Sequence, residues 1–185
     1  MKNTVIKMAL VVLMIGGLIN IYKAKNHILI ENHVENNITF QSSVPISRYE
    51  SEIVYEGLTL KELSEKIDKH LNSTLDGYGE TIASMALDRG VDPVVAASII
   101  LLETGCKWSC SSLVNTNYNV GGMRGSSGWM KFNSLEEGIS AFIGNLQVNY
   151  YKQGLTTPEL MNKKYASSPS WAMKVNNYIE AIKAS

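Results

Sequence analysis

The sequence predicts a mainly helical domain, interrupted by one loop-rich lobe and preceded by an N-terminal membrane helix. Three observations support this fold class. Apolar residues recur at helical spacing beside helix caps in residues 57–185, strand patterns are nearly absent, and the chain opens with an apolar run behind lysines. The length of 185 residues suits one domain and a tail.

Composition excludes some functions without naming one. The formal net charge is zero, so the chain lacks the basic footprint of a nucleic-acid-binding protein, and we expect no nucleic-acid partner. His27 and His33 are six residues apart, a spacing that suits no helical metal face, and no cysteine accompanies them. We therefore expect no metal site.

The beginning of the chain predicts a membrane helix. Lys2 and Lys7 precede an uncharged run at residues 8–22, and Lys23 closes it. The run falls short of the ~20 residues that span a bilayer, but residues 4–6 can extend it. The two early lysines favour an N-terminus on the cytoplasmic side.

These features divide the chain into three parts. We expect a signal anchor at residues 1–25, a polar extracytoplasmic linker at 26–56 and the folded domain at 57–185. No small-x-small cleavage site follows Gly17, which favours an uncleaved, single-pass anchor in the cell membrane. Cleavage and secretion of the domain is the alternative.

Two short amphipathic helices are expected first. Thr59 and Glu62 form a capping box, and an apolar face follows at Leu60, Leu63, Ile67 and Leu71. A turn at residues 76–79 leads to a second helix at about residues 80–88, which ends at Gly90.

The third helix, residues 94–105, is the most apolar and carries one carboxylate near its end. Asp92 is a natural N-cap, Pro93 suits the first helical position, and Gly105 is a plausible stop. Helical spacing places Glu103 on one buried stripe with Ile99 and Ile100. Apolar neighbours and the helix C-terminus both disfavour its charge, so we expect a raised pKa, as a general acid requires.

A polar segment, residues 105–128, follows this helix and is expected to be loop, with a short hairpin around residues 121–132. This segment and the hairpin together contain side chains suited to sugar hydroxyl and acetamido groups and two rings suited to stacking on sugar faces. These are Asn115, Asn117, Tyr118, Asn119, Trp108 and Trp129. Turn chemistry alone explains any single asparagine, so the clustering carries the argument.

Cys106 and Cys110 are the only cysteines. Outside the membrane we expect them to form a disulfide, with two free thiols as the alternative.

Three helices are expected after the loop. Ser134 and Glu137 form a second capping box ahead of an inner stripe at Ile139, Phe142, Ile143 and Leu146. Thr157-Pro158 opens a short helix, and Ser168-Pro169 opens the last one, in which Trp171 is expected on the buried face. Tyr165 is expected in the loop between those two.

The order of these motifs resembles the glucosaminidase family of bacterial peptidoglycan hydrolases, over roughly residues 58–182. The resemblance implies a lysozyme-like helical fold and cleavage of the glycan between N-acetylglucosamine and N-acetylmuramic acid. Each motif is short, and their order and spacing make the set specific. The motifs are Asp92-Pro93, Glu103-Thr-Gly105, Asn117-Tyr-Asn-Val-Gly-Gly122, Ser134-Leu-Glu-Glu-Gly-Ile139 and Tyr165-Ala166.

The resemblance also implies roles for individual residues. Glu103 matches the general acid, Tyr165 the site tyrosine, and Tyr118 with Asn119 the substrate-binding stretch, to which Gly121 and Gly122 belong. General acid chemistry on a sugar implies no cofactor. The expected partners are peptidoglycan glycan strands and the membrane.

A second catalytic carboxylate is missing from the motifs, since no Asp or Glu lies between Glu103 and Ser134. Glu136 is the candidate, because Glu137 fits the capping box. Assistance by the substrate's acetamido group and lytic transglycosylase chemistry, with Glu103 as acid and then base, are the other solutions.

The absent carboxylate also motivates a different class of function, a catalytically inactive wall-binding or assembly module. The small size is consistent with opening the wall for an envelope-spanning machine and equally with wall turnover.

Overall fold

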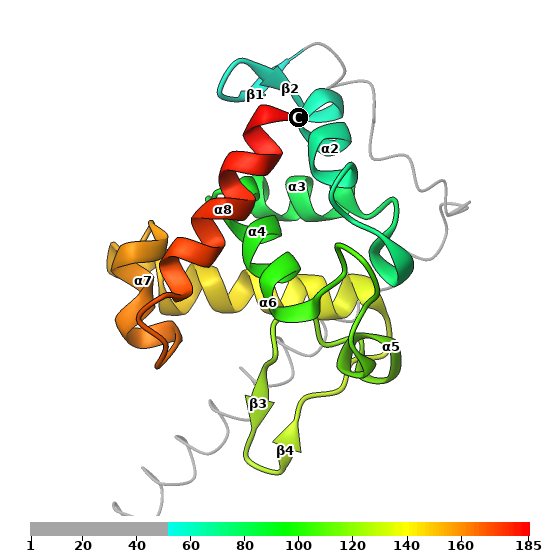
Figure 1. The fold of residues 1–185 in the computed structure, drawn as a ribbon, viewed down its shortest axis with the longest axis vertical. Coiled ribbons are helices and arrows are strands. Elements are labelled where there is room, and N and C mark those ends of the chain that lie inside the picture. The colour runs from blue at the N-terminus through cyan, green and yellow to red at the C-terminus, as the bar shows by residue number, and fades with distance from the viewer. Residues whose placement is uncertain (1–51) are drawn as a thin grey trace, which may run out of the picture. The chain divides into compact units, whose positions relative to one another are not determined.

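The structure, a computed structural model, describes residues 52–185. These residues form seven α-helices, two 3₁₀ turns and two small antiparallel hairpins (Figure 1). The helices are α2 (Leu60–Asp68), α3 (Gly79–Asp88), α4 (Pro93–Thr104), α5 (Ser112–Asn117), α6 (Leu135–Asn149), α7 (Pro158–Tyr165) and α8 (Trp171–Ala184). The hairpins pair β1 (Ile53–Tyr55) with β2 (Leu58–Thr59) and β3 (Arg124–Gly125) with β4 (Gly128–Trp129).

The predicted membrane helix and linker lie outside the described residues and stay predictions. Within residues 52–185, no helix has the length and apolar character needed to cross a membrane.

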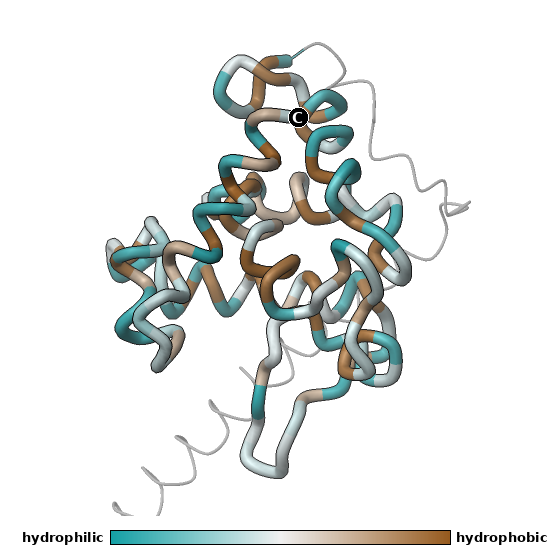
Figure 2. Tube along the Cα trace, viewed as in Figure 1, coloured by the Kyte–Doolittle hydropathy of each residue, from teal (hydrophilic) through white to brown (hydrophobic). Residues whose placement is uncertain are grey.

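Helix α4 is the centre of the domain and packs against α3 and α8. Every residue from Pro93 to Leu101 is buried. The expectation of one buried stripe was therefore wrong, because a helix that is apolar on all sides is enclosed on all sides. Figure 2 shows strongly hydrophobic positions along α4 in the middle of the domain.

The predicted helix starts are largely confirmed. Thr59 and Glu62 form a complete capping box, and the Asp92 carboxylate caps α4 by accepting from Val94 N–H at 2.8 Å. Only half of the second capping box forms. Ser134 accepts from Glu137 N–H, but the Glu137 carboxylate accepts from Asn133 N–H, one residue earlier than expected.

Two boundaries differ from the sequence prediction. Residues 112–117 form the short helix α5 within the expected loop, and Tyr118 closes it in the left-handed conformation, at φ +51°. Tyr165 is the last residue of α7 instead of a loop residue. The hairpin expected around residues 121–132 is present as β3 and β4.

The loop that leaves α5 packs tightly on α6, and two glycines make this approach possible. A Cβ on Gly138 would lie 1.8 Å from the Tyr118 carbonyl oxygen, and one on Gly121 would lie 2.1 Å from the Phe142 ring. Both glycines therefore hold the loop against the domain near the end of α4.

Candidate active site

Glu103 lies in the last turn of α4, where the helix leaves the core. Gly105 takes the left-handed conformation, at φ +68°, and its N–H donates to the Leu101 carbonyl at 3.1 Å, which ends the helix. Leu101 and Thr104 are buried beside Glu103, whereas Glu103 itself is exposed. The end of α4 thus presents one carboxylate to solvent from an otherwise buried helix.

Trp171 holds one oxygen of this carboxylate. Its indole Nε1–H donates to Glu103 Oε1 at 3.3 Å from the first residue of α8. Sequence reasoning placed Trp171 only on a buried helix face and missed this contact. The available signal was that a buried tryptophan needs an acceptor for its N–H group.

Tyr165 lies close to the same carboxylate. Its ring stacks on Trp171 with centroids 4.5 Å apart, and Tyr150 of the α6 end packs on its other side at 5.6 Å. Burial raises the pKa of the Tyr165 phenol well above its ordinary value, and the charge of Glu103 raises it further. The structure therefore brings Glu103 and Tyr165, two predicted site residues, into one cluster with Trp171.

Two opposing effects set the pKa of Glu103. Desolvation by the surrounding protein raises it, and the Trp171 hydrogen bond lowers it, with a net shift above the ordinary value of a glutamate. The residue as a whole is exposed, while Trp171 and the loop at Gly122 lie beside its carboxylate oxygens. The direction agrees with the sequence prediction.

Gly122, in the loop that follows α5, lies beside the Glu103 carboxylate. Gly122 has φ +59°, and a Cβ at this position would lie 3.6 Å from Glu103 Oε2. The Glu103 oxygens therefore have different surroundings, with an indole N–H at Oε1 and loop backbone near Oε2. Because Gly122 has no side chain, nothing from this position covers Oε2.

Asn119 shapes this loop from within. It is only 1% exposed, and its amide donates to the carbonyls of Met123 at 2.8 Å and Met130 at 3.0 Å. Its oxygen accepts from the Met123 N–H at 2.9 Å. Because the amide is committed to the loop, we assign Asn119 a positioning role in place of the sugar contact that the sequence suggested.

Tyr118 and Asn117 lie at the start of the same loop. Tyr118 is half-buried and close enough to Tyr78 to contribute to the raised pKa of that phenol. The Asn117 side chain accepts from Thr116 Oγ1 at 2.8 Å, and its carbonyl accepts from Phe132 N–H at 2.9 Å. Both residues are partly accessible.

Glu136 lies in a different environment from Glu103. It is exposed in the first turn of α6 and accepts from Tyr78 Oη at 3.0 Å. Its own backbone N–H, Ser134 and Tyr78 lower the pKa of this carboxyl, so it stays ionised. Among residues 52–185, no carboxylate contributes to the pKa shift of Glu103. The structure therefore does not couple the two predicted carboxylates.

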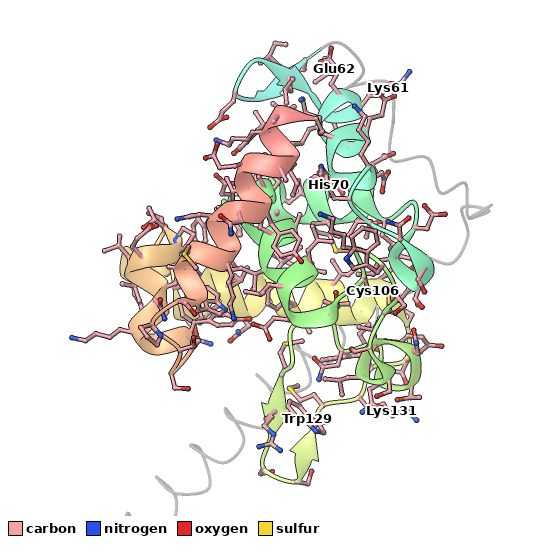
Figure 3. The ribbon with its side chains drawn as sticks, in the orientation of Figure 1. Lys61, Glu62, His70, Cys106, Trp129 and Lys131 are labelled. Atoms are coloured by element: carbon pink, nitrogen blue, oxygen red, sulfur yellow. A yellow bond between two sulfur atoms is a disulfide. The ribbon has the colours of Figure 1, made fainter. Side chains whose placement is uncertain are left out.

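The two predicted stacking residues are strongly exposed and lie on different segments. Trp129 is on the β3–β4 hairpin, with the Arg124 guanidinium 4.2 Å from its ring centroid (Figure 3). Trp108 follows α4 directly, between the two cysteines. Cys106 and Cys110 form the predicted disulfide, which closes the loop that carries Trp108.

No metal-binding constellation exists in the described part of the chain, since no three His, Cys, Asp or Glu side chains converge there.

Comparison with known proteins places this arrangement in a family. A structural search matches the crystal structure of S. aureus autolysin E in complex with the muropeptide NAM-L-Ala-D-iGlu, at a TM-score of 0.56 and 16% identity, covering 69% of this chain and 67% of that one. Curated protein sequences give no significant match. The glucosaminidase family model, described as mannosyl-glycoprotein endo-β-N-acetylglucosaminidase, matches residues 79–184, more than half of the chain. The chain therefore belongs to the glucosaminidase family.

Proposed function

We propose that the protein is an endo-β-N-acetylglucosaminidase that cleaves the glycan strand of peptidoglycan, with Glu103 as its general acid. The observation that carries this proposal is the environment of Glu103. Its pKa is raised by desolvation, its Oε1 is held by Trp171, and it remains accessible to solvent. An acid with a raised pKa keeps a proton near neutral pH and can donate it to a leaving group.

Two further observations favour peptidoglycan as the substrate. Autolysin E, which shares the fold, binds a muropeptide fragment of peptidoglycan in its crystal structure. In this chain, exposed aromatic rings lie on both segments that follow Glu103, at Trp108 and Trp129. Such rings suit the apolar faces of sugars.

The reaction follows from the single acid. Glu103 donates its proton to the glycosidic oxygen, and the bond between that oxygen and C1 of N-acetylglucosamine breaks. The acetamido oxygen of the same sugar attacks C1, an assistance that replaces a carboxylate nucleophile. Ionised Glu103 then takes a proton from the water that opens this intermediate. Tyr165 lies near the carboxylate and is placed to stabilise the positive charge that develops at C1.

Lytic transglycosylase chemistry is the second candidate. It is favoured by the contacts of Glu136, which are with Tyr78 and Ser134 and not with Glu103. In that reaction Glu103 acts first as acid and then as base, and a hydroxyl group of the substrate replaces water as the nucleophile.

Replacement of the acid tests the proposal. We expect Glu103→Gln to lower the rate of glycan cleavage roughly 10²- to 10⁴-fold, because general acid catalysis contributes that range. The assay is release of soluble fragments from purified peptidoglycan by the full-length chain. Glu136→Gln is the matched control and retains most of the activity. Cleavage at the wild-type rate by Glu103→Gln would remove Glu103 from the mechanism.

We also propose that residues 1–25 anchor the domain to the cell membrane with residues 26–185 outside. The lysines around the apolar run support this orientation. The test is fractionation of cells followed by protease treatment of intact protoplasts. Retention in the membrane fraction with loss of the domain to protease supports the anchor, and recovery in the medium supports cleavage. Action beside an envelope-spanning machine stays a proposal that co-purification of membrane partners would test.

A further inference from the structure

Trp108 is the most exposed large hydrophobic side chain that the structure describes, at 81%. It follows the catalytic helix α4 by four residues and lies inside the loop closed by Cys106 and Cys110. A single exposed ring is ordinary on a protein surface, so the neighbours of Trp108 decide whether it marks a binding site.

The loop that carries Trp108 is held from several sides. Trp108 N–H donates to the Gly105 carbonyl at 3.1 Å, and Asn72 N–H donates to the Cys106 carbonyl at 2.8 Å. The Asn72 side-chain amide also donates to the Lys107 carbonyl at 2.8 Å. Together with the disulfide, these hydrogen bonds fix the backbone of the loop. Binding through the Trp108 ring therefore costs little conformational entropy of the loop.

Lys107 adds a positive charge beside the ring. Its Nζ lies 5.5 Å from the Trp108 ring centroid and 6.0 Å from that of Tyr178 on α8. The one ion pair among residues 52–185 joins Lys183 to Glu56, so Lys107 has no carboxylate partner there. Two rings and an uncompensated cation form one surface, which we call the 107–108–178 surface.

This surface and the acid lie along the same helix face. Tyr178 follows Trp171 by seven residues on α8, which is two helical turns, or about 10 Å along the axis. Trp171 donates to Glu103, and Tyr178 lies beside Lys107. A glycan strand of several sugars that is bound at Glu103 is therefore long enough to reach the 107–108–178 surface.

We propose that Trp108, Lys107 and Tyr178 form an accessory subsite that binds the glycan strand away from the bond that is cut. Trp108 stacks on a sugar face, and Lys107 pairs with a carboxylate of the strand, which the peptide stems supply, as do the lactyl groups of muramic acid residues that carry no peptide. This subsite rests on the proposed function for its substrate class. Its role is to favour long strands over short fragments.

The test separates binding from cleavage. In the full-length Glu103→Gln background, sedimentation with purified peptidoglycan gives an affinity without turnover. We expect Trp108→Ala to weaken that affinity roughly 5- to 20-fold, an effect of the size of one lost aromatic contact. Lys107→Gln weakens it less and removes part of its dependence on salt. Val148→Ala on α6, a change at another exposed apolar residue, is the matched control and leaves the affinity unchanged.

In the active enzyme, Trp108→Ala raises KM for long strands more than it raises KM for a short fragment. Unaltered sedimentation of Trp108→Ala would overturn the subsite. So would binding to vesicles of anionic lipid that Trp108→Ala weakens, since that would make the ring a membrane contact. Failure of the wild-type chain to cleave peptidoglycan would instead contradict the proposed function, and the sedimentation result would still decide whether the surface binds glycan.

Discussion

In the proposed mechanism the chemistry depends on one residue, Glu103, whose environment opposes its charge. Desolvation raises its pKa, and the Trp171 indole N–H partly offsets that shift by stabilising the ionised form. Trp171 also occupies Oε1 as a donor, which leaves Oε2, beside Gly122, to carry the acidic proton. These contacts give two predictions at the scale of single residues.

Glu103→Gln is expected to leave the fold intact and to raise its thermal stability at neutral pH. Because the pKa of Glu103 is higher in the folded than in the unfolded chain, the folded state binds more protons, and its stability falls as pH rises through that interval. Glutamine carries no charge to desolvate. The gain in stability therefore appears at pH values above the folded-state pKa of Glu103 and disappears at pH values below its unfolded-state pKa. Melting temperatures of both chains across pH measure this, and equal curves would mean that Glu103 is not desolvated.

Trp171→Phe is expected to lower kcat roughly tenfold, because a hydrogen bond to a charged group is lost and the carboxylate is less well oriented. The ring that stacks on Tyr165 is kept. Loss of the donor also raises the pKa of Glu103, so the decline of kcat on the alkaline side moves to higher pH. The kcat–pH profile is the measurement. A lower kcat with an unmoved profile would indicate a structural role only.

Residue-level prediction from sequence succeeded where a local pattern carried the information. Asp92, Pro93 and Gly105 bound the helix that carries Glu103, and Cys106 with Cys110 form the expected disulfide. The contact of Trp171 with Glu103 was not predictable in this way. Helical spacing predicts which face of α8 is buried. It does not predict that the Trp171 indole N–H donates to Glu103, 68 residues earlier in the chain.

At the scale of elements, the site exists because α8, the end of α7 and the loop after α5 meet at the end of α4. The loop reaches Glu103 only because Gly121 and Gly138 allow it to approach α6. The element boundaries that the sequence misplaced have physical causes. Helix α5 has six residues, too few to show an apolar pattern of helical period. Helix α7 runs one residue further than expected, through Tyr165.

Gly138→Ala is expected to destabilise the domain by about 3 kcal/mol and to lower activity, since the new Cβ would overlap the Tyr118 carbonyl. Gly144→Ala on the same helix is the matched control, because nothing lies within 4 Å of its Cβ position. That substitution is neutral or stabilises by up to ~1 kcal/mol. Denaturant unfolding of both variants provides the comparison, and equal stabilities would refute the close approach of loop and helix.

Reduction of the disulfide is expected to cost about 2 kcal/mol or less, because the closed loop is short. The chain has only two cysteines, so any effect of reductant belongs to this pair. A Cys106→Ala/Cys110→Ala chain that does not respond to reductant is the control. The free energy of unfolding with and without reductant measures the cost, and a much larger loss would show that the loop supports the whole core.

At the scale of the whole molecule, the order of short motifs was enough to predict the family. The match at residues 79–184 confirms that prediction, and the likeness to autolysin E supports the mainly helical fold. The reaction is a separate question, because one fold supports different chemistries and the site decides between them. Here Glu103 has a raised pKa beside Trp171, and the other candidate carboxylate, Glu136, has a lowered pKa and its own contacts with Tyr78 and Ser134.

The most direct test of this account is the identity of the sugar ends that the full-length chain produces from purified peptidoglycan. Mass spectrometry with and without borohydride reduction distinguishes them, and Glu103→Gln provides the blank. The account predicts new reducing ends on N-acetylglucosamine, absent from the Glu103→Gln digest. Anhydro-muramic ends would establish the lytic reaction instead. Reducing muramic ends, or an unchanged digest with Glu103→Gln, would contradict the account.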